Sequence, residues 1–271
     1  MKRQLITLNN ETISYLADDQ IKDLVVLFIH GFGDSSKRVL SLFNINNRNY
    51  SLVAIDLPGC GLSSNNNDIS IEYYCEIVSQ FISQILPNKK IYLLSHSLGI
   101  LPALYNSKIH SNIKHIFGIT PLLPLDLDDS EIKEIKGYLL PNDSNEFYIS
   151  QLQLFSDSEN DWILKDETKQ IILKTSLEFL QKRKKMFSYI VNQIFNSNIV
   201  KEMFDSFYAT NDNLSIVISA NDKFINYKKA LNVIKHYHIE YTELNSYGHA
   251  MFYNGTKDIN KIIEEYIKEV K

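Results

Sequence analysis

A junction between a strand and a helix around Ser97 carries the residue types that a nucleophilic serine needs. The segment from Ile91 to Ile100 reads IYLLSHSLGI, so an apolar strand passes directly into a helix, with a small residue two positions before and two positions after Ser97. A sharp turn of this kind holds the serine in a strained backbone conformation and projects its hydroxyl from the carboxyl edge of a sheet. Ser97 is therefore the candidate nucleophile.

Two alternatives exist for this segment. The usual motif is G-x-S-x-G, and Ser95 stands in place of its first glycine, which makes Ser95 a competitor for the role of nucleophile. Gly99 favours Ser97, because it lies two residues after it and sets the register of the turn. The other alternative is that Ser95 or Ser97 only caps the N-terminus of the helix.

A glycine-containing loop, HGFGDS at residues 30–35, follows another apolar strand. Glycine lets the backbone approach a substrate closely, and a backbone N–H at such a point stabilises a developing oxyanion. We expect the amides of Phe32 and Leu98 to form this oxyanion hole. A dinucleotide-binding fingerprint is the competing interpretation, but its third glycine position holds Ser36. We interpret His30 as a structural residue that braces the loop.

The elements that must position these residues form an alternating pattern. Short, continuous apolar runs indicate strands that are buried on both faces, and amphipathic stretches indicate the helices between them. The pattern predicts an α/β fold with a mostly parallel sheet and helices on both faces. Near the N-terminus, residues 4–8 and 11–16 instead predict an antiparallel hairpin that turns at Asn9 and Asn10. The predicted buried strands are residues 24–29, 52–55, 91–94, 113–119 and 214–218, and the predicted helices include 71–85, 98–105 and 259–270.

The alternating pattern stops between Pro121 and Asp212. Long segments with helical spacing occur there, including residues 162–180 and 185–207, and they predict a helical cap, or lid, inserted into the core. We therefore expect a core made of residues 1–120 and 213–271, with residues 121–212 as the lid.

Composition narrows the class of protein. The chain has 271 residues, of which 44% are hydrophobic, and a formal net charge of −4, with no long stretch of one sign. This composition is that of a globular protein and gives no electrostatic footprint for nucleic acid. Cys60 and Cys75 lack metal-ligand spacing and predict free thiols in a reducing compartment. Without a signal peptide or a membrane-spanning run, we expect a cytoplasmic protein with no integral membrane association.

A third motif, DLPGCGLS at residues 56–63, follows the next strand. With the segments around Phe32 and Ser97, it gives a chain that resembles the α/β-hydrolase family, in its lid-bearing esterase and lipase-like branch, over nearly the whole length. The resemblance implies the α/β-hydrolase fold and a structural role for this third loop. Cys60, within that loop, is interpreted as a packing residue and not as a nucleophile.

The resemblance also implies an acid and a base, in the chain order Ser, Asp or Glu, His. Asp222 follows the strand at 214–218 and occupies the family's acid position, while His249 follows Gly248 in a segment similar to the family's base loop. Asp212 competes less well because it precedes the strand, and a further alternative is the acid position after the strand at 113–119. The residues available there are Asp126, Asp128 and Asp129, and the histidines that fit the base position less well are His96, which we expect to point away, His110, His115, His236 and His238.

The implied activity is hydrolysis of carboxylic esters through an acyl-enzyme, without a cofactor or metal. A serine at position 97 argues against dehalogenase or epoxide hydrolase chemistry, because those branches use aspartate as the nucleophile. An amidase, a peptidase, a thioesterase and a non-catalytic ligand receptor with this fold are the alternatives. The oligomeric state is open.

We expect a small-molecule ester with a small to medium, largely apolar acyl group, bound under the lid. The proposed pocket residues are Phe32, Phe155, Trp162 and Phe187. The basic run at residues 182–185 is interpreted as a solvated helix face.

Overall fold

The structure, a computed structural model, describes residues 1–270 of the chain. Within these residues, eight strands form one sheet in the order β1-β2-β4-β3-β5-β6-β7-β8. From β4 to β8 neighbouring strands run parallel, whereas β1, β2 and β4 pair antiparallel. The sheet confirms the predicted fold class. The strands are β1 (Lys2–Leu8), β2 (Glu11–Ala17), β3 (Leu24–Ile29), β4 (Ser51–Ile55), β5 (Lys90–His96), β6 (Ile113–Ile119), β7 (Leu214–Ile218) and β8 (Glu240–Glu243).

The N-terminal hairpin turns where the sequence predicts. Asn9 and Asn10 have φ values of 46° and 62°, and Leu8 pairs with Glu11 across the turn. Two successive residues with positive φ give a two-residue turn whose twist matches that of the strands, and asparagine tolerates this conformation better than most residues.

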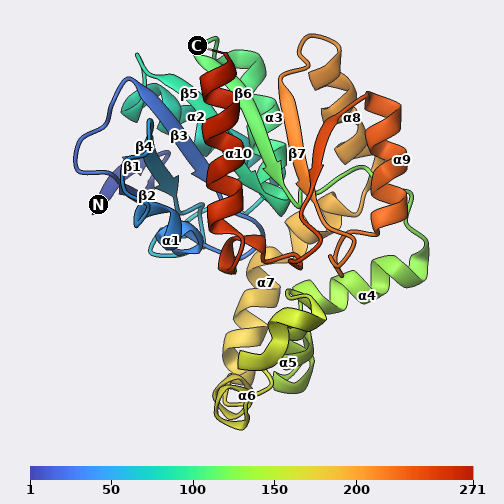
Figure 1. Cartoon of the computed structure of the whole chain (residues 1–271). Helices are drawn as coiled ribbons and strands as arrows, with labels where there is room; N and C mark the ends of the chain where they lie inside the picture. Colours follow the sequence, from blue (N-terminus) through green and yellow to red (C-terminus); the bar gives the residue numbers. More distant parts are fainter. Residues whose placement is uncertain (271) are drawn as a thin grey trace.

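Helices cover both faces of the sheet (Figure 1). Alternate residues of β3 point to opposite sides: Val25 and Leu27 belong to one apolar core, and Val26 and Phe28 belong to the other. The second core is closed by α1 (Leu40–Phe43) and α10 (Thr256–Glu269). The first is closed by α2 (Ile71–Ile85), α3 (Ile100–Ile109), α8 (Ser197–Tyr208) and α9 (Tyr227–Tyr237).

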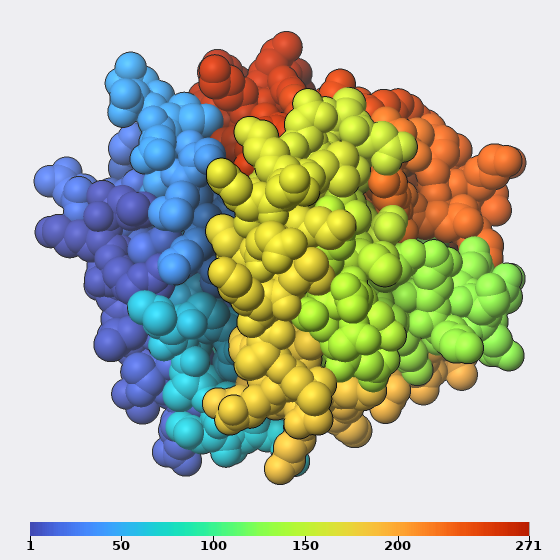
Figure 2. All heavy atoms as spheres, turned by 90° about the horizontal axis from the view of Figure 1, so that it is seen from below, coloured from blue at the N-terminus to red at the C-terminus, as the bar shows by residue number. Residues whose placement is uncertain are grey.

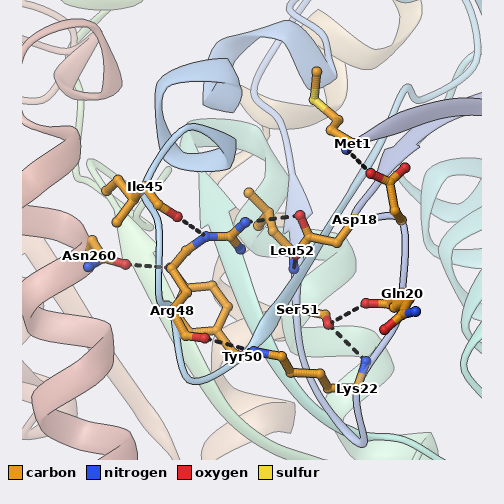
Figure 3. Close-up of polar contacts among 11 residues, drawn as sticks. Met1, Asp18, Gln20, Lys22, Ile45, Arg48, Tyr50, Ser51, Leu52 and Asn260 are labelled. Carbon is orange, nitrogen blue, oxygen red and sulfur yellow. Dashed lines mark hydrogen bonds and ion pairs between the residues drawn. The ribbon is translucent and has the colours of Figure 1, made fainter.

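A network of polar contacts joins the start of β4 to α10 and to the chain after β2 (Figure 3). Arg48 is 9% exposed, donates to a carboxylate oxygen of Asp18 at 2.9 Å, and carries its guanidinium over the ring of Tyr50. The hydroxyl of Tyr50 donates to Asn260 in α10 at 2.7 Å. These bonds satisfy polar groups that the packing of α10 on the sheet would otherwise bury unpaired.

Between β6 and β7 the chain forms helices that lie at the carboxyl edge of the parallel strands, below the sheet in Figure 1. Seen from below, residues of α5, α6 and α7 cover the middle of this face (Figure 2). In contrast, α8 packs against α3 in the core layer. The helices are α4 (Asp129–Leu139), α5 (Ser144–Gln153), α6 (Asp166–Leu173), α7 (Leu177–Ile194) and α8, with a 3-10 turn at Asp157–Trp162.

The two long helical segments predicted here are each interrupted, so the prediction of continuous helices is wrong. Residues 162–180 contain a break before α7, where the hydroxyl of Ser176 accepts the amide hydrogen of Phe179. Residues 185–207 contain a break before α8, where Asn196 caps the helix. Capping residues satisfy the unpaired amides of a helix start, and this allows the chain to turn between helices. In the part of the chain that the structure describes, no helix is long and apolar enough to cross a membrane.

Candidate active site

Ser97 lies at the tight turn between β5 and α3. Its φ is +49°, in the left-handed region that serine rarely adopts, and it opens a 3-10 turn that leads into the helix. Holding a residue in this conformation costs free energy, and such strained positions are concentrated at functional sites. The backbone of Ser97 therefore has the strained geometry expected of a nucleophile elbow.

Gly99 is required because α3 begins very close to β3. A Cβ atom at position 99 would lie 2.4 Å from the carbonyl oxygen of Ile29 and 2.8 Å from that of His30. Any side chain here would push the helix away from the strand and move Ser97 with it. The close packing of α3 on β3 therefore explains why the residue two positions after Ser97 is a glycine.

Ser95 faces a different environment from Ser97. It is fully buried in β5, and its hydroxyl donates to the carbonyl oxygen of Phe117 in the neighbouring strand at 3.3 Å. Ser97, by comparison, lines two cavities at the carboxyl edge of the sheet. Of the two serines, Ser97 is the one with access to a ligand.

Asp222 and His249 form a buried, hydrogen-bonded pair. His249 Nδ1 donates to Asp222 Oδ2 at 2.8 Å, and the two residues are 8% and 4% exposed. The other carboxylate oxygen accepts the amide hydrogens of Phe224 at 2.7 Å and Ile225 at 3.0 Å. A carboxylate held in this way fixes the tautomer of the imidazole, so Nε2 is the nitrogen left to accept a proton.

The backbone of His249 is also held. Its carbonyl oxygen accepts one hydrogen bond from His96 Nε2 at 2.9 Å and a second from the Thr120 hydroxyl at 3.1 Å. The expectation that His96 points away from the site is therefore wrong, because its ring packs 5.1 Å from that of His249. Burial, followed by the nearby His249, lowers the pKa of His96 to about 3. His96 is thus a neutral donor that positions the base.

Gly248 is required because the base loop lies close to the chain after α5. A Cβ atom at position 248 would lie 2.4 Å from the backbone nitrogen of Ser156 and 2.5 Å from the carbonyl carbon of Phe155. Glu159 accepts the amide hydrogen of Gly248 at 2.7 Å, and the amide of Ala250 donates to the carbonyl oxygen of Leu154. The segment after α5 therefore supports the base loop directly.

The competing acids have other surroundings. Asp128 caps α4, where its carboxylate accepts the amide hydrogens of Ser130 and Glu131 at 2.9 Å. Asp212 is exposed and precedes β7, so it lies at the opposite edge of the sheet from Ser97. Asp129 is exposed within α4, whereas Asp126 is exposed at the rim of the first cavity.

The competing histidines also lie outside the pair. His236 and His238 are exposed at the end of α9. His110 is hydrogen-bonded to Ser79 at 2.9 Å, and His115 stacks on Tyr266 with 3.9 Å between the ring centroids. Among the histidines considered for the base position, His249 is the one bonded to an acid at this edge.

The loop after β3 brings Phe32 to the two cavities that Ser97 lines, and Leu98 lines the first of them. His30, fully buried, ties this loop down: its Nδ1 donates to the carbonyl oxygen of Gly31 at 2.7 Å, and its Nε2 accepts the amide hydrogen of Leu57 at 2.9 Å. Burial lowers the pKa of His30, so the ring stays neutral and acts as a brace.

The third motif forms a buried polar loop. Asp56 accepts the amide hydrogen of Ser36 at 2.6 Å and pairs with Arg3 at 2.8 Å. Burial acts to raise the pKa of Asp56, but hydrogen bonds from Ser36, Ser14 and Leu62 together bring it below its ordinary value. Cys60 is buried in this loop, and burial raises the pKa of its thiol to about 12, which leaves it protonated and unreactive.

Two cavities meet at Ser97 and His249. The leucine cavity, of about 130 Å³, is lined mainly by aliphatic side chains from the chain after β6, from α4 and from the region where α7 ends and α8 begins. The arginine cavity, of about 240 Å³, lies beside it under α5 and α7. The apolar lining of the leucine cavity comprises Phe32, Leu98, Leu122, Leu123, Pro124, Leu125, Leu127, Ile132, Ile135, Leu139, Ile194, Phe195, Val200, Phe224 and Ile225.

Three of the four predicted pocket residues lie elsewhere. Phe32 lines both cavities, but Phe155 and Trp162 pack on Tyr253 in a separate apolar cluster behind the base loop. Phe187 is buried against the ring of Phe32 with centroids 5.0 Å apart. These aromatic rings attach the cap to the core. The leucines after β6, which carry no special sequence signal, line the cavity instead.

Comparison with known proteins gives the family of the chain. A family model described as "alpha/beta hydrolase fold" matches residues 25–256. "Putative esterase/lipase 2" of Mycoplasma pneumoniae is 22% identical over 255 residues, which are 90% of this chain and 89% of that protein.

Solved structures share the fold over nearly the whole chain. A "putative lipase" from Acinetobacter baumannii AYE superposes with a TM-score of 0.80 at 19% identity, and the match covers 99% of this chain and 91% of that one. The alpha/beta hydrolase MGS-M2, from a Medee basin deep-sea metagenome library, gives 0.77 at 14% identity and covers 98% and 97% of the two chains.

Proposed function

Because the chain belongs to the alpha/beta hydrolase family, we propose that it is a cofactor-independent serine hydrolase that cleaves carboxylic esters with Ser97, His249 and Asp222. The observation that carries the proposal is one juxtaposition. Ser97, strained at φ +49°, lines the same cavity as His249. Nδ1 of the His249 ring is hydrogen-bonded to Asp222. The names of the similar proteins, esterase and lipase, point to the same reaction type.

The chemistry follows from these positions. His249 Nε2 takes the proton of Ser97 as the serine oxygen attacks the ester carbonyl, and Asp222 stabilises the imidazolium that forms. The amides of Phe32 and Leu98 hold the oxyanion of the tetrahedral intermediate. His249 then returns the proton to the departing alcohol, and the acyl group stays on Ser97. Water repeats the attack, releasing the acid and restoring the serine.

The leucine cavity is the proposed site for the acyl group. Its lining is apolar, and its volume of about 130 Å³ is below the roughly 300–1,000 Å³ of pockets that hold drug-sized ligands. An acyl group of small to medium size fits this space. Helices α4 to α7 would act as the lid, because α4 and α7 contribute lining residues while α8 is anchored on α3.

Turnover of aryl esters tests the proposal. Purified protein is assayed with 4-nitrophenyl esters of increasing acyl length, alongside matched thioesters and anilides, and Ser97→Ala is the control. We expect repeated turnover of the oxygen esters, a preference for short or medium chains, and loss of activity in the variant.

The alternatives give different results in the same assay. Faster cleavage of anilides or thioesters would assign an amidase or a thioesterase. A burst of a single equivalent with no further product would indicate a receptor. Equal activity in Ser97→Ala and wild type would contradict the proposed nucleophile.

A further inference from the structure

Arg183 differs from the other members of its basic run. Lys182, Lys184 and Lys185 are exposed on α7, as the interpretation of a solvated helix face expects. Arg183 instead turns inward and lines the arginine cavity together with Phe32, Ser97 and His249. The interpretation is therefore wrong for this residue, because an arginine with an apolar stem can reach into a cavity that the neighbouring lysines do not face.

The guanidinium of Arg183 is fixed by packing. Its central carbon lies 4.9 Å from the ring centroid of Phe32 and 5.4 Å from that of Phe187, which are cation–π distances. It also lies against Gly33, where an added Cβ would come within 2.3 Å of Nη1. A cation held on two rings and a glycine is preorganised, so a ligand that binds it spends little entropy on ordering it.

The charge of Arg183 is not neutralised by the groups around it. Its Nε is buried and has no hydrogen-bond partner among residues 1–270. Asp34 is the carboxylate whose charge raises the pKa of Arg183. Asp34, however, already pairs with Arg38 Nε at 2.6 Å. Cys60 and Tyr74 are also close, and burial raises the pKa of each, so both are neutral.

A partly desolvated cation without a counter-ion favours an anionic ligand. Burial lowers the pKa of Arg183, yet guanidinium groups stay protonated at neutral pH. The planar group offers donors that match a carboxylate or a phosphate in a bidentate manner. The aliphatic lining of the leucine cavity leaves the arginine cavity as the place for such a polar group.

We infer that Arg183 is a specificity residue that binds an anionic group, a carboxylate or a phosphate, on the alcohol part of the ester substrate. This inference rests on the proposed function, because it assumes that the scissile carbonyl lies at Ser97. Ser97 and His249 line both cavities, so an ester placed there extends its acyl group into one and its alcohol into the other. The substrate would then be an ester with an apolar acyl chain and an anionic alcohol.

The test is the selectivity between a charged and a neutral leaving group of the same shape. The probes are the butyrate esters of 4-hydroxybenzoate and of 4-hydroxybenzamide, with 4-(butyryloxy)phenyl phosphate as the phosphate arm. The ratio of kcat/KM, anionic over neutral, is measured for wild type, Arg183→Gln, Arg183→Lys and Lys182→Gln. Intrinsic differences in leaving-group reactivity cancel when ratios are compared between variants.

We expect the ratio to fall about tenfold or more in Arg183→Gln, since a charge-assisted hydrogen bond is lost. Arg183→Lys should retain part of the ratio, and Lys182→Gln should retain all of it. The arm whose ratio falls further from wild type to Arg183→Gln identifies the carboxylate or the phosphate as the preferred anion. An unchanged ratio in Arg183→Gln would overturn the inference.

A measurement on the unaltered protein guards against a variant that does not fold. Phenyl phosphate and benzoate should inhibit cleavage of the neutral ester competitively, and benzyl alcohol should inhibit far less. Equal inhibition by all three would overturn the inference. Absence of turnover of every ester by wild type, or persistent turnover by Ser97→Ala, would instead contradict the proposed function.

Discussion

His249 Nδ1 lies 2.8 Å from Asp222 Oδ2, and each of the two residues is anchored a second time at its other end. Asp222 accepts the amide hydrogens of Phe224 and Ile225, while the carbonyl oxygen of His249 is held by His96 and Thr120. Rotation of the imidazole would break its bond to Asp222, while the other four bonds hold the carboxylate and the His249 backbone in place. Such preorganisation keeps Nε2 directed at one place in the cavity.

The first prediction concerns this pair. Asp222→Asn should lower kcat about 10³- to 10⁴-fold, because an amide favours the wrong tautomer of His249 and carries no charge to stabilise its cation. His249→Ala should cost at least as much. Steady-state kinetics with an aryl ester measure both effects.

The matched controls are Asp128→Asn and Asp212→Asn. Asparagine still caps a helix, so Asp128→Asn should leave kcat within about twofold of wild type. Near-normal activity in Asp222→Asn combined with a large loss in Asp128→Asn would move the acid to the chain after β6.

The second prediction concerns chain-length selectivity. Ile135 of α4 lines the leucine cavity and is partly exposed, so a larger ring can be accommodated there at modest cost. Ile135→Phe should reduce kcat/KM for the longer acyl chains first, because each buried methylene contributes roughly 0.8 kcal/mol only while space remains. The profile of kcat/KM against acyl length is the measurement.

Trp162→Phe is the comparison, because Trp162 packs on Phe155 and Tyr253 away from both cavities. It should lower stability without shifting the preferred length. If Trp162→Phe shifts the preferred acyl length and Ile135→Phe does not, the acyl group binds at the aromatic cluster of Trp162 and not in the leucine cavity.

A third prediction contrasts two glycines. Gly248→Ala should lower the free energy of unfolding by about 1–3 kcal/mol and reduce activity, since its methyl group would overlap the backbone of Phe155 and Ser156. Gly137 lies in α4 with nothing within 4 Å of an added Cβ. Gly137→Ala should therefore stabilise the protein by about 0.5–1 kcal/mol. Urea unfolding distinguishes the two, and equal effects would contradict the packing role of Gly248.

The fourth prediction is that the folded protein loses stability in acid. Burial lowers the pKa of His115 to about 3, and burial with the nearby His249 does the same for His96. In the unfolded chain a histidine has a pKa of about 6.5. The unfolded state therefore binds more protons below that pH, so stability is fully present above pH 6.5 and is lost as the pH falls toward about 3.

Urea unfolding at pH 7 and pH 5 measures this slope. His115→Phe keeps the stacking on Tyr266 and removes one titrating group. It should reduce the pH-dependent loss by roughly 2 kcal/mol. An unchanged slope would show that His115 does not remain neutral in the folded state.

Strands and turns were predictable because their causes are local. Parallel strands buried on both faces appear as continuous apolar runs, and three of the five predicted ones match their observed bounds, as in β3. The elbow was readable because a strand, a small residue and a helix adjoin around Ser97. Helical spacing, however, continued across the capped breaks at Ser176 and Asn196.

The parts of the site that were missed depend on contacts between distant segments. Glu159 supports the amide of Gly248 across 89 positions, and His96 reaches the carbonyl of His249 across 153. Neither residue carries a local signal. Arg183 belongs to a run of exposed lysines, and only the packing of α7 over Phe32 distinguishes it. Aromatic residues of the cap were expected in the pocket, but they pack the cap against Tyr253 and Phe32 of the hydrolase core.

The identity of the nucleophile is tested most directly by a fluorophosphonate probe followed by mass spectrometry of the digested protein. We predict one equivalent of label on the Ser97 hydroxyl, unchanged labelling in Ser95→Ala, and none in Ser97→Ala. His249→Ala should label slowly, because the base that activates the hydroxyl is missing. Label on Ser95, or stoichiometric labelling of Ser97→Ala, would contradict the account.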